Sequence, residues 1–160
     1  MRLASALMVT AYLLCCCQNA SSELTEEQKN SIVSELKKRL DDYRLAVVKK
    51  DAEWFRSFWL NSKEFAVALD GDYNTDYDPW FETSYTKALP AIKEILHFKF
   101  GEGRATVLNE NAASYTTTFD WGMVIDNNDT IMSKGSIVYV FVRKDGEWKC
   151  VQTGGTHKYY

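Results

Sequence analysis

The chain has 160 residues, of which 46% are hydrophobic and 14% aromatic, and its formal net charge is −3. This length suits one domain with an adequate core, and the apolar and aromatic content excludes a disordered chain. Interspersed charges with a negative balance argue against a nucleic-acid partner, and two His with four badly spaced Cys form no zinc-ligand pattern, so we expect neither a metal nor a cofactor.

The first 22 residues are predicted to be a signal peptide. Arg2 supplies a positive end, and the uncharged run over 3–14 is too short to cross a bilayer comfortably. One route of processing is cleavage after Ser22. The other is lipidation of Cys17 in "LLCCC", which resembles a bacterial lipoprotein box but lacks the usual small residue before the modified Cys. Either route predicts a secreted or cell-envelope protein that contacts a membrane only through a lipid anchor.

Residues 23–160 are predicted to form a single domain that begins with helices. Apolar residues recur every three or four positions from Ile32 to Val47, which is typical of one buried helix face. Asp51 is a suitable cap for a second helix, because its carboxylate can accept from free backbone N–H groups. Asp78 with Pro79 predicts the start of a third helix.

Strands dominate the second half of the chain. They are predicted over 95–100, 104–108, 112–125, 131–142 and 148–153, after a shorter strand over 65–69. Residues 137–142 are apolar at every position, which predicts a strand covered on both faces. Helices first and a long meander afterwards predict an α+β fold, with the helices on one face of a curved antiparallel sheet.

Three segments, "YRLAVVKKDAEWFRSFW" (43–59), "FAVALDG" (65–71) and "GSIVYVFVRKDGEWKCV" (135–151), resemble the nuclear transport factor 2-like superfamily, most closely its SnoaL-like branch. The resemblance covers about residues 24–157. It implies a cone-shaped fold, shared with ketosteroid isomerase, in which N-terminal helices pack in a strongly bent antiparallel sheet. It also implies a pocket at the wide end of the cone and a homodimer formed through the sheet.

The resemblance to ketosteroid isomerase implies one catalytic pair. Tyr43 stands eight residues before Asp51, as the isomerase's helix-1 Tyr does, and Asp70 ends a strand where that enzyme has its general base. A carboxylate in an apolar pocket has a raised pKa and can move a proton next to a carbonyl, while a phenol can bond the resulting oxyanion. The alternative is that Tyr43 is a core residue and that Asp70, which precedes Gly71, is a turn residue.

The closing strand resembles the SnoaL-like pattern Trp-x-Ile-x-His-x-His in part. Trp148 and Cys150 match its start, but the two His positions fall on Gln152 and Gly154, and His157 has the opposite parity. Chemistry based on His is therefore not expected at this strand. The predicted ligand pocket consists of Trp54, Tyr85, Tyr115, Asp120, Trp121 and Gln152. Asp120 would be a second candidate acid only if the polar face of its strand looks into the cone.

Three functions remain open. The first is an exported domain of unassigned activity that binds a small apolar or aromatic molecule in its pocket, dimerises through its sheet, or does both. The second is an isomerase, dehydratase or cyclase that uses Asp70 as general base and Tyr43 as oxyanion donor. The third is a structural assembly module without a ligand.

Overall fold

A computed structural model describes residues 23–160. The predicted signal peptide and the lipidation at Cys17 lie outside these residues. The helices are α1 (Glu26–Lys49), α2 (Ala52–Phe58), α3 (Tyr77–Phe81), a π-helix (Glu82–Ala88) and α4 (Leu89–Ala91). The strands are β1 (Ala66–Leu69), β2 (Asp72–Asn74), β3 (Ile92–Phe100), β4 (Arg104–Asn109), β5 (Ala112–Ile125), β6 (Thr130–Lys144) and β7 (Glu147–Tyr159). Within this part of the chain no helix has the length and apolar character needed to cross a membrane.

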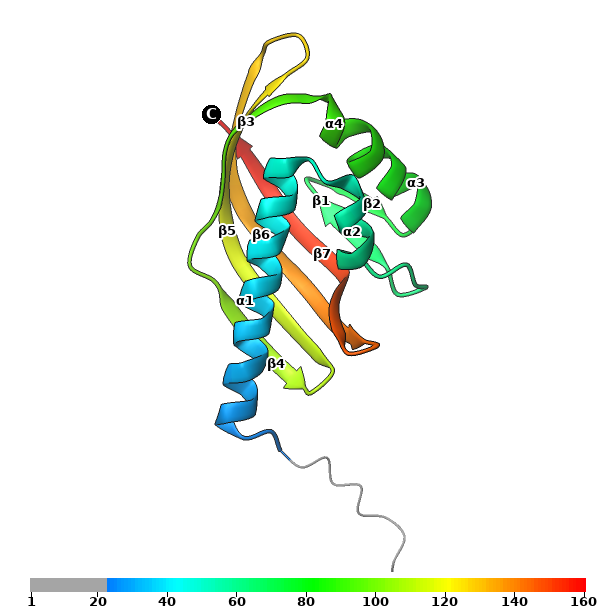
Figure 1. The fold of residues 1–160 in the computed structure, drawn as a ribbon, viewed down its shortest axis with the longest axis vertical. Helices are drawn as coiled ribbons and strands as arrows, with labels where there is room; N and C mark the ends of the chain where they lie inside the picture. Colours follow the sequence, from blue (N-terminus) through cyan, green and yellow to red (C-terminus); the bar gives the residue numbers. More distant parts are fainter. Residues whose placement is uncertain (1–22) are drawn as a thin grey trace, which may run out of the picture.

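The strands form one curved, unclosed sheet in the order β2–β1–β7–β6–β5–β3, and β4 also pairs with β5. α1 crosses one face of this sheet, and α2 to α4 lie beside it near β1 and β7 (Figure 1). The predicted α+β architecture is therefore confirmed. The sheet differs from the prediction in one pair, because β1 runs parallel to β7 while the other pairs are antiparallel.

Local sequence explains how the helices begin. Thr25 and Gln28 form a capping box at the start of α1, and the Asp51 side chain accepts from the Trp54 backbone N–H at 3.0 Å, which confirms Asp51 as the cap of α2. The third helix differs from the prediction, since α3 already begins at Tyr77 and its N-terminus has no side-chain cap. The predicted apolar stripe of α1 is buried against the sheet at Ile32, Leu36, Leu40 and Val47.

The sheet has an inner face toward α1 and an outer face. On β5 the residues Ala113, Tyr115, Thr117 and Phe119 are buried on the inner face, and the residues between them point outward. On β6 the outward-facing residues from Val138 to Val142 are only half-buried, so this chain alone does not cover both faces of that strand as predicted.

A β-bulge at Val151 interrupts the alternation of β7. Cys150 pairs with Phe141 and Gln152 pairs with Val140, so Val151 has no partner in the register. The extra residue reverses which of the following residues face inward. Gln152 therefore lies on the outer face, where it is exposed and its Nε2 donates to the Glu64 carbonyl at 3.1 Å. His157 lies on the inner face, in register with Gly135, which is the reverse of the predicted parity.

Candidate functional site

Asp70 and His157 form a two-point contact where β1 ends beside β7. The His157 backbone N–H donates to Asp70 Oδ1, and Nδ1 of the same residue contacts Oδ2, both at 2.6 Å. The backbone hydrogen bond is the main reason that the pKa of Asp70 is lowered. An ionised Asp70 accepts a hydrogen bond from Nδ1–H, which leaves the Nε2 lone pair of His157 available to another group.

Asp70 also occupies a turn, as the alternative interpretation predicted. Its φ is 54°, in the left-handed region that Asp tolerates better than most residues, and Gly71 follows with a φ of 94°. Its pKa is lowered, whereas a carboxylate acting as a general base in a dry pocket needs a raised one.

Tyr43 is engaged elsewhere, in the aromatic core. Its hydroxyl lies 3.3 Å from the Tyr85 hydroxyl, which also accepts from Trp59 Nε1–H at 2.9 Å. Desolvation raises the pKa of both Tyr43 and Tyr85. The hydrogen bonds of the described residues thus join Asp70 to His157 and Tyr43 to Tyr85, and they do not join Asp70 to Tyr43.

Aromatic side chains fill the space around Tyr43. Its ring centroid lies 4.9–6.4 Å from the rings of Trp54, Phe55, Phe58, Phe98, Phe100 and Tyr139. Among the predicted pocket residues, half-buried Trp54 also lies under the Arg39 guanidinium, 4.9 Å from ring centroid to Cζ. Tyr115 is buried farther along the inner face of β5. These residues serve as core packing here.

The inner face near His157 is aromatic as well. Phe119 lies 4.8 Å from the His157 ring, and Tyr159 stacks on that ring at 6.1 Å. Gly135 stands between Phe119 and His157 in the sheet. A Cβ at Gly135 would lie 1.8 Å from the Thr156 carbonyl oxygen and 2.7 Å from Phe119 Cζ. The absence of a side chain at Gly135 is therefore what lets Phe119 reach His157.

Two buried donors lie in the neighbouring row of the same face. Trp121 Nε1 and Ser133 Oγ have no hydrogen-bond partner within residues 23–160, and the two residues pair across β5 and β6. Ser133 is fully buried, and it also pairs with Tyr159 on β7. Buried donors are normally satisfied, so an unpaired neighbouring couple calls for an explanation. The other such atoms in this part of the chain, Ser62 Oγ and Arg143 Nε, lie on other elements or farther along β6.

Asp120 lies on the outer face and does not line the inner surface as the pocket prediction required. Its Oδ1 accepts from Tyr160 OH at 3.0 Å and lies 2.8 Å from His97 Nε2. The bonds to His97 and then Tyr160 lower the pKa of Asp120. Of the predicted pocket residues, Trp121 alone lies beside the His157 region and has a free polar atom.

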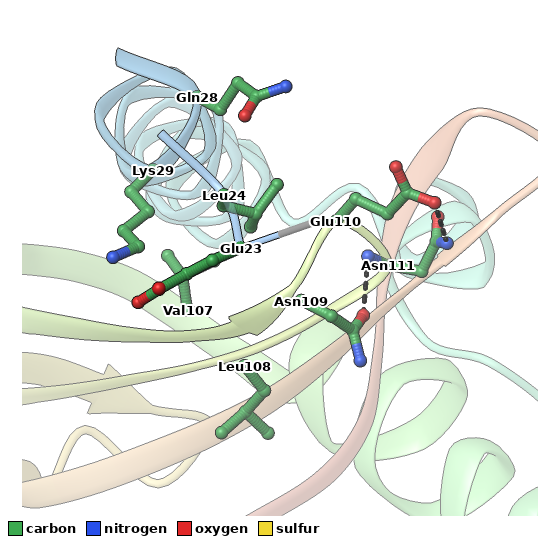
Figure 2. A pocket seen from close by; sticks show the side chains of 9 residues that line it. All are labelled: Glu23, Leu24, Gln28, Lys29, Val107, Leu108, Asn109, Glu110 and Asn111. Atoms are coloured by element: carbon green, nitrogen blue, oxygen red, sulfur yellow. Dashed lines mark hydrogen bonds between the residues drawn. The ribbon is translucent and has the colours of Figure 1, made fainter. Parts of the chain in front are cut away.

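Three hollows lie at the periphery of the described domain. One of about 800 Å³ separates the start of α1 from the β4–β5 turn, and Figure 2 shows Leu24 and Val107 among polar side chains there. None of the unpartnered buried atoms of residues 23–160 belongs to its lining. A second hollow lies on the outer face of the sheet, and a third lies between α1 and β3. Residues 23–160 contain no group of three or more His, Cys, Asp or Glu placed to hold a metal ion.

His157, Phe119 and Ser133 were missed from the sequence, and one signal could have found His157. Trp148, Cys150 and Val151 are all apolar, so two successive apolar residues break the alternation where the bulge occurs. With Val151 left out, the inward positions after Cys150 are Thr153, Gly155 and His157. Phe119 shares the strand face of Tyr115 and Trp121, so the alternation along this segment marks it, whereas no comparable signal marks Ser133.

Comparison with known proteins identifies the fold. No protein-family model and no curated protein matches the sequence. A nuclear transport factor 2-like superfamily protein from Salmonella enterica serovar Typhimurium superimposes with a TM-score of 0.71 at 16% identity, over 79% of this chain and 91% of that one.

Two further solved structures are similar. A hexachlorocyclohexane dehydrochlorinase, LinA-type3 from Novosphingobium barchaimii, gives a TM-score of 0.69 at 12% identity over 85% and 93% of the two chains. A protein of unknown function from Shewanella oneidensis gives 0.59 at 16% identity over 80% and 98%. Identities this low establish the fold and leave the activity open. The chain therefore has the nuclear transport factor 2-like fold.

Proposed function

We propose that the protein binds a small apolar or aromatic molecule carrying a hydrogen-bond acceptor, on the inner face of the sheet beside His157. The observation that carries this proposal is the pair of buried, unpartnered donors, Trp121 Nε1 and Ser133 Oγ. A buried donor without a partner destabilises the folded protein by about 1–3 kcal/mol. A ligand that supplies the acceptor removes this penalty, which adds to its affinity.

The surroundings define the chemistry of the ligand. Phe119 and Tyr159 flank His157 with aromatic rings, which favour a flat or apolar molecule. The two donors favour a carbonyl, ether or hydroxyl oxygen on that molecule. Aromatic walls with a few convergent polar groups are typical of small-molecule sites.

The test is a screen of small aromatic ketones and phenols by NMR, following the indole N–H of Trp121, which a Trp121→Phe variant assigns. A ligand that bonds this donor moves its resonance, and Ser133→Ala weakens binding by about fivefold to tenfold, the loss of one hydrogen bond. Ser136→Ala, on the outer face of the same strand, is the matched control and should bind normally. The proposal fails if no compound moves the resonance, or if both Ser variants bind equally well.

A second function, proton transfer, is favoured by the contact between Asp70 and His157. A carboxylate that holds Nδ1–H fixes the tautomer and orientation of the ring, which prepares Nε2 as a general base. In this scheme His157 takes the proton and Asp70 is a positioning residue. One structure with the same fold is named a hexachlorocyclohexane dehydrochlorinase, so the fold is compatible with an enzyme.

Proton transfer can be tested by deuterium incorporation into enolisable cyclic ketones in D₂O. His157→Gln should abolish the exchange and Asp70→Asn should slow it, while His97→Gln, the matched change on the outer face, should leave it intact. Exchange that survives His157→Gln excludes this base. Exchange lost in Tyr43→Phe would instead support the pairing of Asp70 with Tyr43.

A further inference from the structure

A hollow of about 670 Å³ lies on the outer face of the sheet and is lined by Lys99, Lys134 and Lys158. The register connects them, because Lys99 pairs with Asp120, Asp120 with Lys134, and Lys134 with Lys158. The four side chains form one row across β3, β5, β6 and β7. With strands about 4.8 Å apart, the row spans roughly 14 Å.

This row carries positive charge that the described residues do not neutralise. All three lysines are exposed, and within residues 23–160 none has an acidic group within 4.0 Å. Asp120 is already bonded to His97 and Tyr160. Lys134 and Lys158 are direct cross-strand partners, and like charges in that position are destabilising. A local excess of positive charge thus persists on a protein whose net charge is −3.

A row of hydroxyl groups runs beside the lysines. Thr118 pairs with Ser136 and Ser136 with Thr156, all three are exposed, and all three line the same hollow. The hollow therefore offers ammonium donors along one side and hydroxyl donors and acceptors along the next.

We propose that this hollow binds an acidic oligosaccharide. Its sulfate or carboxylate groups contact Lys99, Lys134 and Lys158, and its sugar hydroxyls bond the row of Thr118, Ser136 and Thr156. An extended acidic sugar chain carries both kinds of group side by side, which matches the two rows. The volume of the hollow falls within the range of about 300–1,000 Å³ that is usual for ligand sites.

Two other occupants fit less well. A nucleic acid would need several exposed aromatic faces for successive bases, whereas beside the two rows a single exposed ring of residues 23–160, that of Tyr160, lies 5.2 Å from Lys134 Nζ. A second copy of this chain docked row against row would bring three lysines and one Asp from each copy together, which leaves an excess of like charge at the contact. The charge pattern therefore selects an anionic partner.

The test measures binding of the protein to three octasaccharides by calorimetry at two salt concentrations. One is sulfated (a heparin fragment), one is carboxylated (oligogalacturonate) and one is neutral (maltooctaose). Comparison of the sulfated with the carboxylated octasaccharide shows whether the protein binds sulfate or carboxylate groups. The variant replaces Lys99, Lys134 and Lys158 by Gln. Its matched control replaces Lys37, Lys49 and Lys144, which are exposed elsewhere, and makes the same change in net charge.

At least one acidic octasaccharide should bind, more weakly at high salt, and the variant in the row should lose at least tenfold in affinity. The variant loses three lysine contacts, and each exposed charge pair contributes up to about fivefold in affinity. The control should stay within twofold of the unaltered protein.

Four results would each overturn the proposal. They are equal losses in both triple variants, equal binding of maltooctaose, single-stranded DNA that binds as tightly and depends on the same lysines, or a dimer that the Gln substitutions in the row disperse.

Discussion

The sheet carries two His–carboxylate pairs, one on each face. The two pairs differ in how the carboxylate is held and in which side chains surround it. His157 on the inner face holds both oxygens of Asp70 through its ring and its backbone N–H. His97 on the outer face contacts one oxygen of Asp120, which it shares with Tyr160. The first pair lies beside Phe119 and a row of unpartnered donors, and the second lies beside lysines.

A His–Asp contact alone therefore does not define a site. What distinguishes the inner pair is that both oxygens of its carboxylate are engaged and that buried groups nearby lack partners within residues 23–160. The outer pair is a partly exposed contact next to charges of both signs, where solvent competes with each bond.

Substitution of the glycine beside each His should distinguish the two pairs by the free energy of unfolding that it costs. Gly135→Ala places a Cβ against the Thr156 backbone oxygen next to His157, and backbone cannot move aside cheaply. We expect a loss of about 3 kcal/mol or more in the free energy of unfolding. Gly122→Ala places a Cβ against the ends of the Met132 and His97 side chains, which can turn away, and should lose less than about 1.5 kcal/mol. Urea unfolding measures both, and similar losses would remove the distinction.

The next effect tests the unpartnered donors. Ser133→Ala removes a buried hydroxyl without a partner, so the ligand-free protein should gain about 1 kcal/mol of stability. Ser136→Ala, on the exposed outer face, should change stability by less than about 0.5 kcal/mol. Thermal unfolding of both variants provides the measurement, and a destabilised Ser133→Ala would mean that this hydroxyl is already bonded.

The smallest effect compares the two carboxylates. Asp70→Asn should cost less than about 1 kcal/mol at pH 7, because the side chain of Asp70 is 38% exposed and solvent screens the lost charge. Since the pKa of Asp70 is lowered from 3.8 in the folded state, its stabilising contribution is fully present above that value. The difference between wild type and variant should therefore vanish as the pH falls below 3.8 through the folded-state pKa.

Asp120→Asn is the comparison for that titration. Because Asp120 is more exposed and shares its bonds with the terminal Tyr160, we expect a smaller loss of stability at pH 7 than for Asp70→Asn. Denaturant unfolding in steps from pH 7 to pH 2.5 measures both variants. A difference for Asp70→Asn that persists below the folded-state pKa would contradict the ionic nature of its contact with His157.

Much of the fold could be predicted because it depends on local spacing. The stripe of α1, the cap at Asp51 and the order of helices before strands each follow from a few neighbouring residues. The parallel pairing of β1 with β7 could not be predicted, because the local sequence of a strand does not specify which distant strand will pair with it.

The candidate site could be predicted only in part, for the same reason. Tyr43 and Asp70 were singled out by their positions along the chain, but their hydrogen-bond partners are 42 and 87 residues away. Tyr85 and His157 decide what the two residues do, and local sequence does not reveal these pairings, although Tyr85 is one of the predicted pocket residues. Gln152 was assigned to the pocket on the assumption of regular alternation. The single extra residue in the bulge places it on the outer face, because a shift of one residue moves every following side chain to the opposite face.

The bulge at Val151 also determines how this strand can change by deletion. Loss of the codon for Val151 would leave a regular strand with His157 still facing α1. Loss of the codon for Gly154 would advance the end of the strand by one place, turning His157 outward and Lys158 inward. A related sequence that lacks the bulge would therefore align correctly along β7 only with a gap at Val151, and a gap placed elsewhere would assign residues of one face of the strand to the other face.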